Sequence, residues 1–342
     1  MSRLFKRGRM LVAVLVTALA FVVAGAVPAL AAEPGESAAW TNESIGGGQV
    51  NSPDTYSEAR SPSTSALVQI YRGDDDRVWV AVNNGPAFAA GGGTNTTVTH
   101  VAPRVVYLDG WFYAFQTGTD NRIYWSRAFD GIVGSNTPSV SLAYNWSGWT
   151  AISGNPATQQ SVSVAAVPGQ GLLMTWLGVN QTAMYSAWLQ SGSDVFNPTQ
   201  SIPHNSNSAP VVTYSDQDNE FYLVYRGLLD NQVYMTEQIL GQSTWLDNTA
   251  LTGLTTPTSP TIAADANGNL LVAAIDMNDN IWFQAINGAD ETHGWSRESV
   301  GEQSVVPLWI SVISSIFYVL ATNSDIGGVV QWKLAWNAGK GI

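Results

Sequence analysis

Two arginines recur in this chain at equivalent places from which they could bind a polyhydroxylated ligand. Arg72 and Arg226 each follow a tyrosine and precede a glycine. A guanidinium carries a planar fork of N–H donors that can hold hydroxyl oxygens beside an aromatic wall. The same side chains could equally pair with carboxylates of a nearby turn, so two roles remain open for them.

Acidic and amide side chains follow these arginines in short polar segments. Asp75 and Asp230 belong to this group, and Asp75 lies within the run Asp74-Asp75-Asp76. Their carboxylates could accept hydrogen bonds from sugar hydroxyls or hold a divalent cation weakly. Asp and Asn are also the residues that tight turns require, because their side chains bond to the backbone two residues on. We therefore expect a turn role for most of them and ligand contact for some.

Tryptophan is abundant, with 14 residues in a chain of 342. Trp40, Trp149, Trp245 and Trp295 each open a short segment that ends in a glycine. An indole can stack on the apolar face of a pyranose ring, and it can equally pack in a core. We expect these four residues on outer strands with one solvated side, so either role is open to them.

The elements that position these residues are defined by a strand–turn–strand phrase that occurs six times. The phrases are Leu67 to Ala81, Phe112 to Ser126, Leu172 to Ala187, Phe221 to Thr236, Leu270 to Gln284 and Ile316 to Ala335. They align on the aromatic residue after the turn, which recurs at intervals of 45 to 61 residues as Trp79, Tyr124, Tyr185, Tyr234, Trp282 and Trp332. A period of about fifty residues built of strands is typical of a β-propeller, in which stacked blades bury each other's faces.

The full repeat predicts an all-β, six-bladed β-propeller. Another short apolar strand precedes the phrases, with a less certain one in the first unit between Tyr56 and Arg60, and a tryptophan-led strand follows several of them. The segment that begins at Trp40 stands before the first phrase, whereas little chain remains after the last. We therefore expect the N-terminal strand to close the last blade. Residues between Arg127 and Asn145 should form a surface loop, and the aromatics after the turns should pack between blades.

The first residues predict export. Arg3, Lys6, Arg7 and Arg9 precede an apolar run and the small-residue pattern Ala29-Leu30-Ala31, which is the order found in a secretory signal peptide. We expect residues 1–31 to be removed, residues 32–342 to form a single propeller, and the protein to be secreted. Retention of the run as an anchor is the alternative, and no membrane insertion is expected after processing.

Composition excludes several classes of partner. The formal net charge is −12, and this sign repels nucleic acid and anionic lipid. Cysteine is absent, so stability must come from core burial and ring closure. The glycine runs at 46–48 and 91–93 have no phosphate-binding context. We expect no cofactor and no metal site, although His100 and His204 precede inner strands of alternate units.

The phrase resembles the repeat of PLL-type and tectonin-like propeller lectins over about residues 40–336. The resemblance rests on an aromatic-rich second strand ending in RG or TG, the turn GTDNRIYW, and an outer strand opening with Trp146 to Trp149. The chain departs from that repeat in two ways: the Arg-Gly pair is found in only two of the six units, and Gly327-Gly328 lengthens the sixth turn. The resemblance implies non-catalytic, multivalent binding of glycans or cell-surface glycoconjugates through repeated shallow pockets.

Two other functions remain possible from the sequence. A propeller of this kind could serve as a protein-interaction or cell-envelope scaffold. A sialidase-like glycoside hydrolase is a further alternative, but its S-x-D-x-G-x-T-W box is matched here by little more than Asp325-Ile326-Gly327. For the carbohydrate-binding function the predicted contacts are Arg72, Asp75, Trp149, Arg226, Asp230, Trp245 and Trp295.

Overall fold

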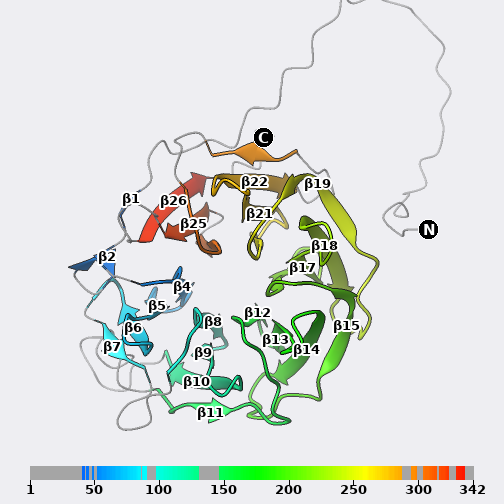
Figure 1. The fold of residues 1–342 in the computed structure, drawn as a ribbon. Helices are drawn as coiled ribbons and strands as arrows, with labels where there is room; N and C mark the ends of the chain where they lie inside the picture. Colours follow the sequence, from blue (N-terminus) through cyan, green and yellow to red (C-terminus); the bar gives the residue numbers. More distant parts are fainter. Residues whose placement is uncertain are drawn as a thin grey trace, which may run out of the picture.

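The chain folds as a ring of β-sheets around a central axis (Figure 1). The computed structural model describes residues 41–42, 44–45, 48–49, 52–85, 87–90, 98–130, 146–286, 294–298, 303–313, 316–322 and 329–335. All the secondary-structure elements within these ranges are β-strands. The same ranges contain no helix long and apolar enough to cross a bilayer. The strands of the described residues form six four-stranded antiparallel sheets and one small hairpin. The predicted all-β, six-bladed propeller is therefore confirmed.

Each sheet is one blade, and its strands follow one another from the axis to the rim. Blade 1 consists of β4 (Ser57–Arg60), β5 (Leu67–Arg72), β6 (Val78–Val82) and β7 (Phe88–Ala89). Blade 2 consists of β8 (Arg104–Leu108), β9 (Trp111–Thr117), β10 (Ile123–Phe129) and β11 (Thr150–Ala151). Blade 3 consists of β12 (Ser163–Val167), β13 (Gly171–Leu177), β14 (Ala183–Gln190) and β15 (Gln200–Asn205).

The second half of the ring has the same organisation. Blade 4 consists of β16 (Val211–Ser215), β17 (Glu220–Arg226), β18 (Gln232–Ile239) and β19 (Thr249–Thr255). Blade 5 consists of β20 (Thr261–Ala264), β21 (Leu270–Ile275), β22 (Ile281–Ile286) and β23 (Ser296–Arg297). Blade 6 consists of β24 (Trp309–Ile313), β25 (Ile316–Thr322), β26 (Val329–Ala335) and β1 (Thr41–Asn42). The small hairpin pairs β2 (Ser44–Ile45) with β3 (Gly48–Gln49).

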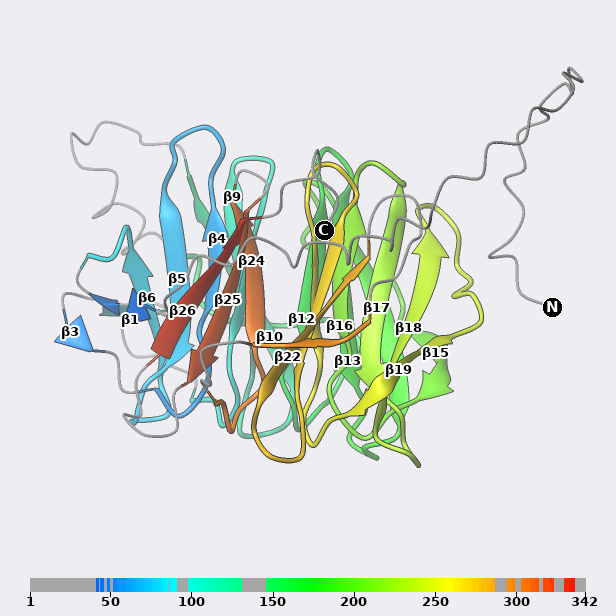
Figure 2. The same cartoon turned by 90° about the horizontal axis from the view of Figure 1, so that it is seen from above.

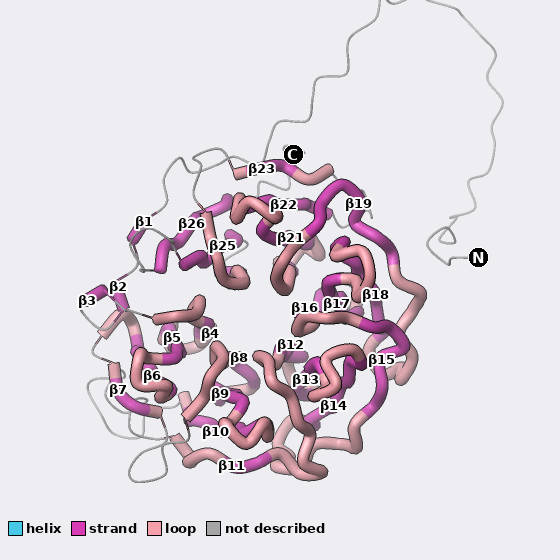
Figure 3. Tube along the Cα trace, in the orientation of Figure 1, coloured by secondary structure: helices cyan, strands magenta, loops and turns pink. Residues whose placement is uncertain are grey.

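The repeated phrase forms the second and third strands of every blade, as the sequence predicted. All six expected inner strands are present, including the one between Tyr56 and Arg60, which is β4. Figure 3 shows β4, β8, β12 and β16 facing the axis of the ring. The turns between the second and third strands contain residues with positive φ, a conformation that Asn and Asp tolerate. These residues are Asp76, Asn121, Gln181, Asn231 and Asp279, with φ between 57° and 64°.

The N-terminal part of the described chain closes the ring. β1 pairs antiparallel with β26, joining Thr41 to Gln331 and Asn42 to Val330. Blade 6 thus combines three strands from the C-terminal end of the chain with one from its beginning. This pairing covers the outer edge of β26, which would otherwise present unpaired backbone groups. The prediction that an N-terminal strand completes the last blade is confirmed.

A hydrophobic cluster fills each of the six blade junctions of the described residues. At the junction of blades 2 and 3 the cluster includes Phe115, Met174 and Trp176, and at the junction of blades 6 and 1 it includes Tyr56 and Trp309. The remaining four clusters join blades 1 and 2, 3 and 4, 4 and 5, and 5 and 6. Burial of both faces of each blade is the main source of stability that such a ring has.

The aromatics after the turns were expected inside these clusters, and that prediction is right in part. Trp79, Tyr185, Tyr234 and Trp282 pack against the clusters from their edges but stay half-buried. Three of them, Trp79, Tyr234 and Trp282, turn their polar ends to turn carboxylates. Because these carboxylates lie in exposed turns, the hydrogen bonds hold the rings at the edge of the junction and not inside it.

The ring has two different faces, seen edge-on in Figure 2. The loop face carries the turns between second and third strands together with the connections between blades. The hairpin face carries the turns between first and second strands, such as Asp109–Gly110. The loop face is defined by backbone bonds such as Thr99 N to Asp76 O, 2.8 Å, which tie a connection to the turn of the preceding blade.

Five of the connections between blades each contain a buried serine or threonine that bonds to the turn of the preceding blade. We call such a residue, with its hydrogen bonds, a Ser/Thr clasp. These residues are Thr99, Thr158, Ser206, Thr256 and Ser304. Their backbone N–H groups donate to carbonyls of the preceding turn, at Asp76, Asn121, Thr182, Asn231 and Asp279. In Ser206 the hydroxyl donates to Ser208 O at 2.8 Å and accepts from Ser208 N at 3.1 Å. The clasp therefore fixes both ends of the connection that leads into the next blade.

Several sequence expectations fall outside the described residues. They include the signal segment 1–31, Trp40, Trp332 as a side chain, the glycine run at 91–93, and most of the expected surface loop at 131–145. These remain predictions.

Candidate functional site

The turn between the second and third strands has a recurring construction. In blade 1, Asp75 Oδ1 accepts hydrogen bonds from Arg77 N at 3.1 Å and from Trp79 Nε1 at 3.0 Å. The same carboxylate therefore caps the turn and holds the ring that follows it. The arrangement recurs in the pairs Asp120 with Tyr124, Asp230 with Tyr234, and Asp276 with Trp282, at 2.8, 2.7 and 3.0 Å.

Asp230 shows the electrostatics of this turn most clearly. Its Oδ2 accepts from the Tyr234 hydroxyl at 2.7 Å, and its Oδ1 accepts from Gln232 N at 3.2 Å. The hydrogen bond from Tyr234 lowers the pKa of Asp230, and in return it raises the pKa of Tyr234. The turn role expected for Asp75 and Asp230 is therefore visible in both, although each carboxylate keeps a solvated side.

The glycine of the Arg-Gly pair makes room for the ring. A Cβ on Gly227 would lie 2.6 Å from the Tyr234 ring, and one on Gly73 would lie 2.7 Å from Trp79 Nε1. The aromatic side chain thus lies directly across the backbone of the turn. This packing gives the recurrence of glycine at this position a physical reason.

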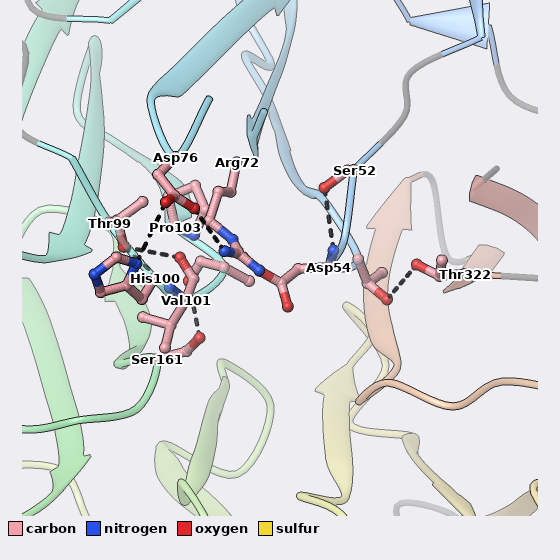
Figure 4. A network of polar contacts seen from close by, with 12 residues as sticks. Ser52, Asp54, Arg72, Asp76, Thr99, His100, Val101, Pro103, Ser161 and Thr322 are labelled. Carbon is pink, nitrogen blue, oxygen red and sulfur yellow. Dashed lines mark hydrogen bonds and ion pairs between the residues drawn. The ribbon is translucent and has the colours of Figure 1, made fainter. Parts of the chain in front are cut away.

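Arg72 joins the turn of its own blade to the segment that precedes β4 (Figure 4). Its Nε is 2.6 Å from Asp54 Oδ2, and its Nη1 is 2.9 Å from Asp76 Oδ1. His100 Nδ1 lies 3.6 Å from the other oxygen of Asp76. Of the two roles left open for Arg72, the structure shows the pairing with carboxylates.

Arg226 occupies the equivalent place in blade 4 and bonds mainly to backbone and amide oxygens. Its Nε donates to Asn207 Oδ1 at 2.6 Å, its Nη2 donates to Asn207 O at 3.3 Å, and its Nη1 donates to the Pro257 carbonyl. Pro257 lies in the connection to blade 5, so the guanidinium ties two blades together. Burial lowers the pKa of Arg226, which stays a cation at neutral pH.

Trp149 and Trp295 bridge neighbouring blades at the rim. Trp149 Nε1 donates to Ala90 O of blade 1 at 3.3 Å, and Trp295 Nε1 donates to Leu251 O of blade 4 at 3.1 Å. Both rings pack against a junction cluster and stay half-buried. Each therefore has a structural role and an accessible part.

Trp245 is not equivalent to Trp149 and Trp295, which corrects the alignment expected from sequence. Tyr124 pairs with Ala151 and Tyr234 pairs with Ala250, so the residue that matches Trp149 is Asn248. Trp245 lies three residues earlier and is 4% exposed within the cluster of blades 3 and 4. Its counterpart in blade 2 is Trp146, which stands five residues before Ala151 as Trp245 stands five residues before Ala250, and both indoles are buried. In this structure the Trp245 ring offers no face to a ligand.

The seven predicted contacts do not come together in one site. Arg226 pairs with Val233 at the loop-face end of β18, whereas Leu246, next to Trp245, bonds to Glu237 four residues farther along. Four residues of strand correspond to about 13 Å. Sugar contact by the exposed parts of Asp75, Asp230, Trp149 and Trp295 stays a prediction.

An exposed aromatic and charged cluster lies on the hairpin face between blades 2 and 3. We call Trp111, Arg127, Phe129 and Asp194 the blade 2–3 cluster. The Arg127 guanidinium lies 4.8 Å from the Trp111 ring centroid, and its Nη1 is 2.8 Å from Asp194 Oδ1 of blade 3. Phe129 packs at 4.9 Å from Trp111 and is 44% exposed. Two aromatic rings, a cation and a carboxylate thus share one accessible patch.

β9 and β10 position this cluster by their register. Trp111 pairs with Phe129, and Arg127 pairs with Tyr113 two residues away. The cluster residues Trp111, Arg127 and Phe129 therefore all lie at the hairpin-face end of the β9–β10 strand pair. Beneath them the buried rings of Tyr113 and Trp125 stack at 6.0 Å. The Asp109 carboxylate, in the turn before Trp111, accepts from Gly169 N and from Ser191 Oγ of blade 3. These contacts fix the junction on which the cluster stands.

Sequence reasoning did not select the blade 2–3 cluster. A usable signal was present, because Asp109-Gly110 predicts a tight turn and the flanking strand positions then place Trp111 opposite Phe129. Asp194 comes from the next blade, and its approach to Arg127 depends on how two blades pack. That part could not be found without the structure.

The described residues contain no group of three or more side chains able to hold a metal ion. His100 lies beside Asp76, while His204 stacks on Tyr225 at 5.9 Å and bonds to Leu246 O. The two histidines therefore have separate partners.

Comparison with known proteins gives the class of the fold. No family model and no curated protein matches the chain. A variant of the Aleuria aurantia lectin in complex with α-methyl-L-fucoside is similar over 86% of this chain and 94% of its own, with 11% identity and a TM-score of 0.58. A variant of AofleA from Arthrobotrys oligospora is similar over 87% and 88%, with 9% identity and a TM-score of 0.60.

The same fold also occurs in an enzyme. A luciferin-regenerating enzyme is similar over 89% of this chain and 98% of its own, with 14% identity and a TM-score of 0.54. At such identities the likeness shows a shared propeller architecture, and the Aleuria aurantia lectin is itself described as a six-bladed β-propeller. Function has to be argued from the residues of this chain.

Proposed function

We propose that this protein is a secreted, non-catalytic carbohydrate-binding propeller of the PLL or tectonin-like type. The observation that carries the proposal is the blade 2–3 cluster, in which Arg127 lies over an accessible tryptophan and against Asp194. The structural likeness to lectins solved with a fucoside supports it at the level of the fold. A fucoside is therefore the first ligand to test.

The chemistry of the cluster suits a neutral sugar. The rings of Trp111 and Phe129 offer an apolar surface for the C–H groups of a pyranose. Arg127 can donate to hydroxyl oxygens, and Asp194, whose side chain is 65% exposed, can accept from hydroxyl protons. Arg127 and Asp194 neutralise each other, so an uncharged ligand need not displace a counter-ion from either.

Within the part of the chain that the structure describes, the combination of tryptophan and arginine found in this cluster occurs at one blade junction. At the positions of Trp111 and Arg127, blade 3 has Gly171 and Trp188, blade 4 has Glu220 and Glu237, and blade 5 has Asn269 and Ala285. Multivalent binding, which the sequence resemblance implies, would need sites of other composition or several chains on one surface.

The two axial cavities favour a binding function over hydrolysis. Among the described residues, the cavity near the loop face is lined by one carboxylate, Asp54, and the cavity near the hairpin face by one, Glu58. Glycoside hydrolysis by the usual route needs two carboxyl groups about 5 to 10 Å apart at one bond. Burial raises the pKa of Glu58, and Ser311 donates to it.

A scaffold function is the second candidate, because apolar side chains project from the loop face. Leu229 is 95% exposed at the turn of blade 4, and Met277 and Val179 hold similar places in blades 5 and 3. An exposed row of this kind fits a protein partner. Secretion supports either function, and N-terminal sequencing of exported protein should begin at residue 32 or 33 if the leader is removed as proposed.

The test of the binding function uses the exported chain on a glycan array, followed by titration with the strongest sugar. Trp111→Ala and Arg127→Gln should each weaken binding at least about tenfold, which is about 1.4 kcal/mol. Arg122→Gln is the matched control, since it removes the same charge from an exposed position at the other end of β10. Equal affinities in all three variants would place the sugar away from this cluster, and no array binding at all would favour the scaffold.

A further inference from the structure

The axis of the ring contains a cavity that the proposed sugar site does not use. It has a volume of about 180 Å³ and is lined by the segments that lead from the loop face into the inner strands. Its wall is largely apolar, with contributions from Val101, Val162, Pro210 and Leu308. This volume is well above the about 10 to 15 Å³ that a cavity needs to hold one water molecule.

A buried arginine faces this cavity. Arg104 is 7% exposed and begins β8 of blade 2. Its guanidinium carbon lies 4.5 Å from the ring centroid of Trp309, which begins β24 of blade 6. Blade 1 stands between these two blades, so the side chain reaches past β4 to its partner. Arg104 lines the loop-face cavity and Trp309 lines the second one, so the pair stands between them.

The charge of Arg104 lacks a carboxylate partner among the residues that the structure describes. Its Nη1 donates to Pro103 O at 3.1 Å, and no ion pair within 4.0 Å joins it to the acids of the described chain. Asp54 is the nearest acid to influence it, but that carboxylate is bound to Arg72 at 2.6 Å. Burial lowers the pKa of Arg104 to about 10, so it is charged at neutral pH.

A buried cation without a counter-ion is costly, and an anion in the adjoining space would offset that cost. A guanidinium binds carboxylates and phosphates well, because its parallel N–H groups match two oxygens of the anion. Asp54 on the same wall disfavours a doubly charged anion, and the apolar lining suits a ligand with a short carbon body.

We propose that the loop-face cavity is a binding site for a small monocarboxylate, held by Arg104. Ser161, whose hydroxyl donates to Ala102 O at 2.9 Å, also contributes to the polar part of the lining, together with Thr55, Gln160 and Ser259. The site is separate from the blade 2–3 cluster, which lies on the hairpin face. Its occupation would stiffen the centre of the ring, where segments from all the blades meet.

Acetate and butyrate serve as probes, in titration calorimetry and in thermal unfolding at constant ionic strength. Both should bind the wild-type protein and raise its melting temperature more than equal concentrations of chloride or phosphate. Arg104→Met should fold, since a buried charge can be replaced by an apolar side chain of similar size without loss of stability. It should lose the response to carboxylates, and Arg104→Lys should bind at least about tenfold more weakly.

Two further variants separate the cavity from general charge effects. Arg60→Met removes an exposed arginine beside the other cavity and should leave the carboxylate response unchanged. Asp54→Asn removes the acid from the wall and should tighten acetate binding. The proposal is overturned if acetate has no effect on the wild type, if Arg104→Met responds equally, or if phosphate and chloride stabilise as well as acetate.

Discussion

Asp230 and Tyr234 show how one side chain serves both the turn and the ring that follows it. The carboxylate caps the backbone of the turn and accepts from the phenol, so the aromatic residue stays at the edge of the junction cluster. The same arrangement holds Trp79, Tyr124 and Trp282. These carboxylates are therefore part of the fold, whatever ligand their exposed oxygens meet.

The turn carboxylate predicts a pH-dependent contribution to stability. The hydrogen bond from Tyr234 holds the folded-state pKa of Asp230 below its ordinary value of 3.8. The contribution is therefore complete above that ordinary value and is lost as the pH falls through the lower folded-state pKa. Asp230→Asn should lower the melting temperature at pH 6, and the difference from wild type should close below about pH 4.

Tyr234→Phe provides the matching background for that measurement. It removes the donor, so adding Asp230→Asn to the Tyr234→Phe variant should produce a change with little dependence on pH. Melting curves between pH 2.5 and 7 measure how much Asp230→Asn lowers the melting temperature in each background. A gap that stays constant or widens below pH 4 would show that Tyr234 does not stabilise the carboxylate.

At the residue scale, roles set by neighbouring residues could be predicted from the sequence, whereas roles set by distant partners could not. The turn role of Asp75 and Asp230 followed from the tendency of Asx side chains to bond to the backbone two residues on. The partners of Arg72 and Arg226 did not follow, because Asp54 and Pro257 approach them from segments distant in sequence. Trp245 was misaligned with Trp149, because the register that makes it equivalent to Trp146 is seen only in the structure.

At the scale of elements, the connections between blades are held by the Ser/Thr clasp as much as by the strands. Each clasp residue is fully enclosed, and its N–H bonds to a turn of the preceding blade. The sequence carries a trace of it, because a serine or threonine stands a few residues before each of the five inner strands concerned. Inner strands and phrases were predicted correctly because their apolar alternation is local, whereas the clasp depends on contact between two blades.

Loss of one clasp hydroxyl should cost measurable stability. The single O–H of Ser206 is shared between Ser208 O at 2.8 Å and Arg226 O at 2.9 Å, and its oxygen accepts from Ser208 N. Ser206→Ala should lower the free energy of unfolding by about 1 to 3 kcal/mol, because buried backbone groups lose their partner. Urea titration followed by tryptophan fluorescence gives the value.

Ser201→Ala is the control for that substitution. Ser201 lies nearby on β15 and is exposed, so its loss should change stability by less than about 0.5 kcal/mol. If the two variants unfold at the same urea concentration, the clasp contributes nothing beyond the strands.

For the whole molecule, stability depends on closing the ring by pairing the two-residue strand β1 with the seven-residue strand β26 from the other end of the chain. The sequence predicted this closure, because a tryptophan-led strand stood unpaired at the beginning and was missing at the end. It also predicted six blades from six phrases. The half-buried position of the aromatics after the turns was not predicted, since it follows from their hydrogen bonds to turn carboxylates.

Deletion of residues 1–47 should open the ring. β26 would lose β1 and expose an unpaired strand edge, so we expect a lower melting temperature and association into oligomers. Deletion of residues 1–31 is the control and should leave both properties unchanged. Size-exclusion chromatography with thermal unfolding compares the two, and equal behaviour would mean that β1 is dispensable for closure.

The central claim is that the accessible patch between blades 2 and 3 binds carbohydrate. A crystal structure of residues 32–342 with their strongest array glycan tests this most directly. We predict a sugar ring against Trp111 and Phe129, with hydroxyl groups within hydrogen-bond distance of Arg127 and Asp194. A glycan bound elsewhere on the ring, with this patch empty, would contradict the claim.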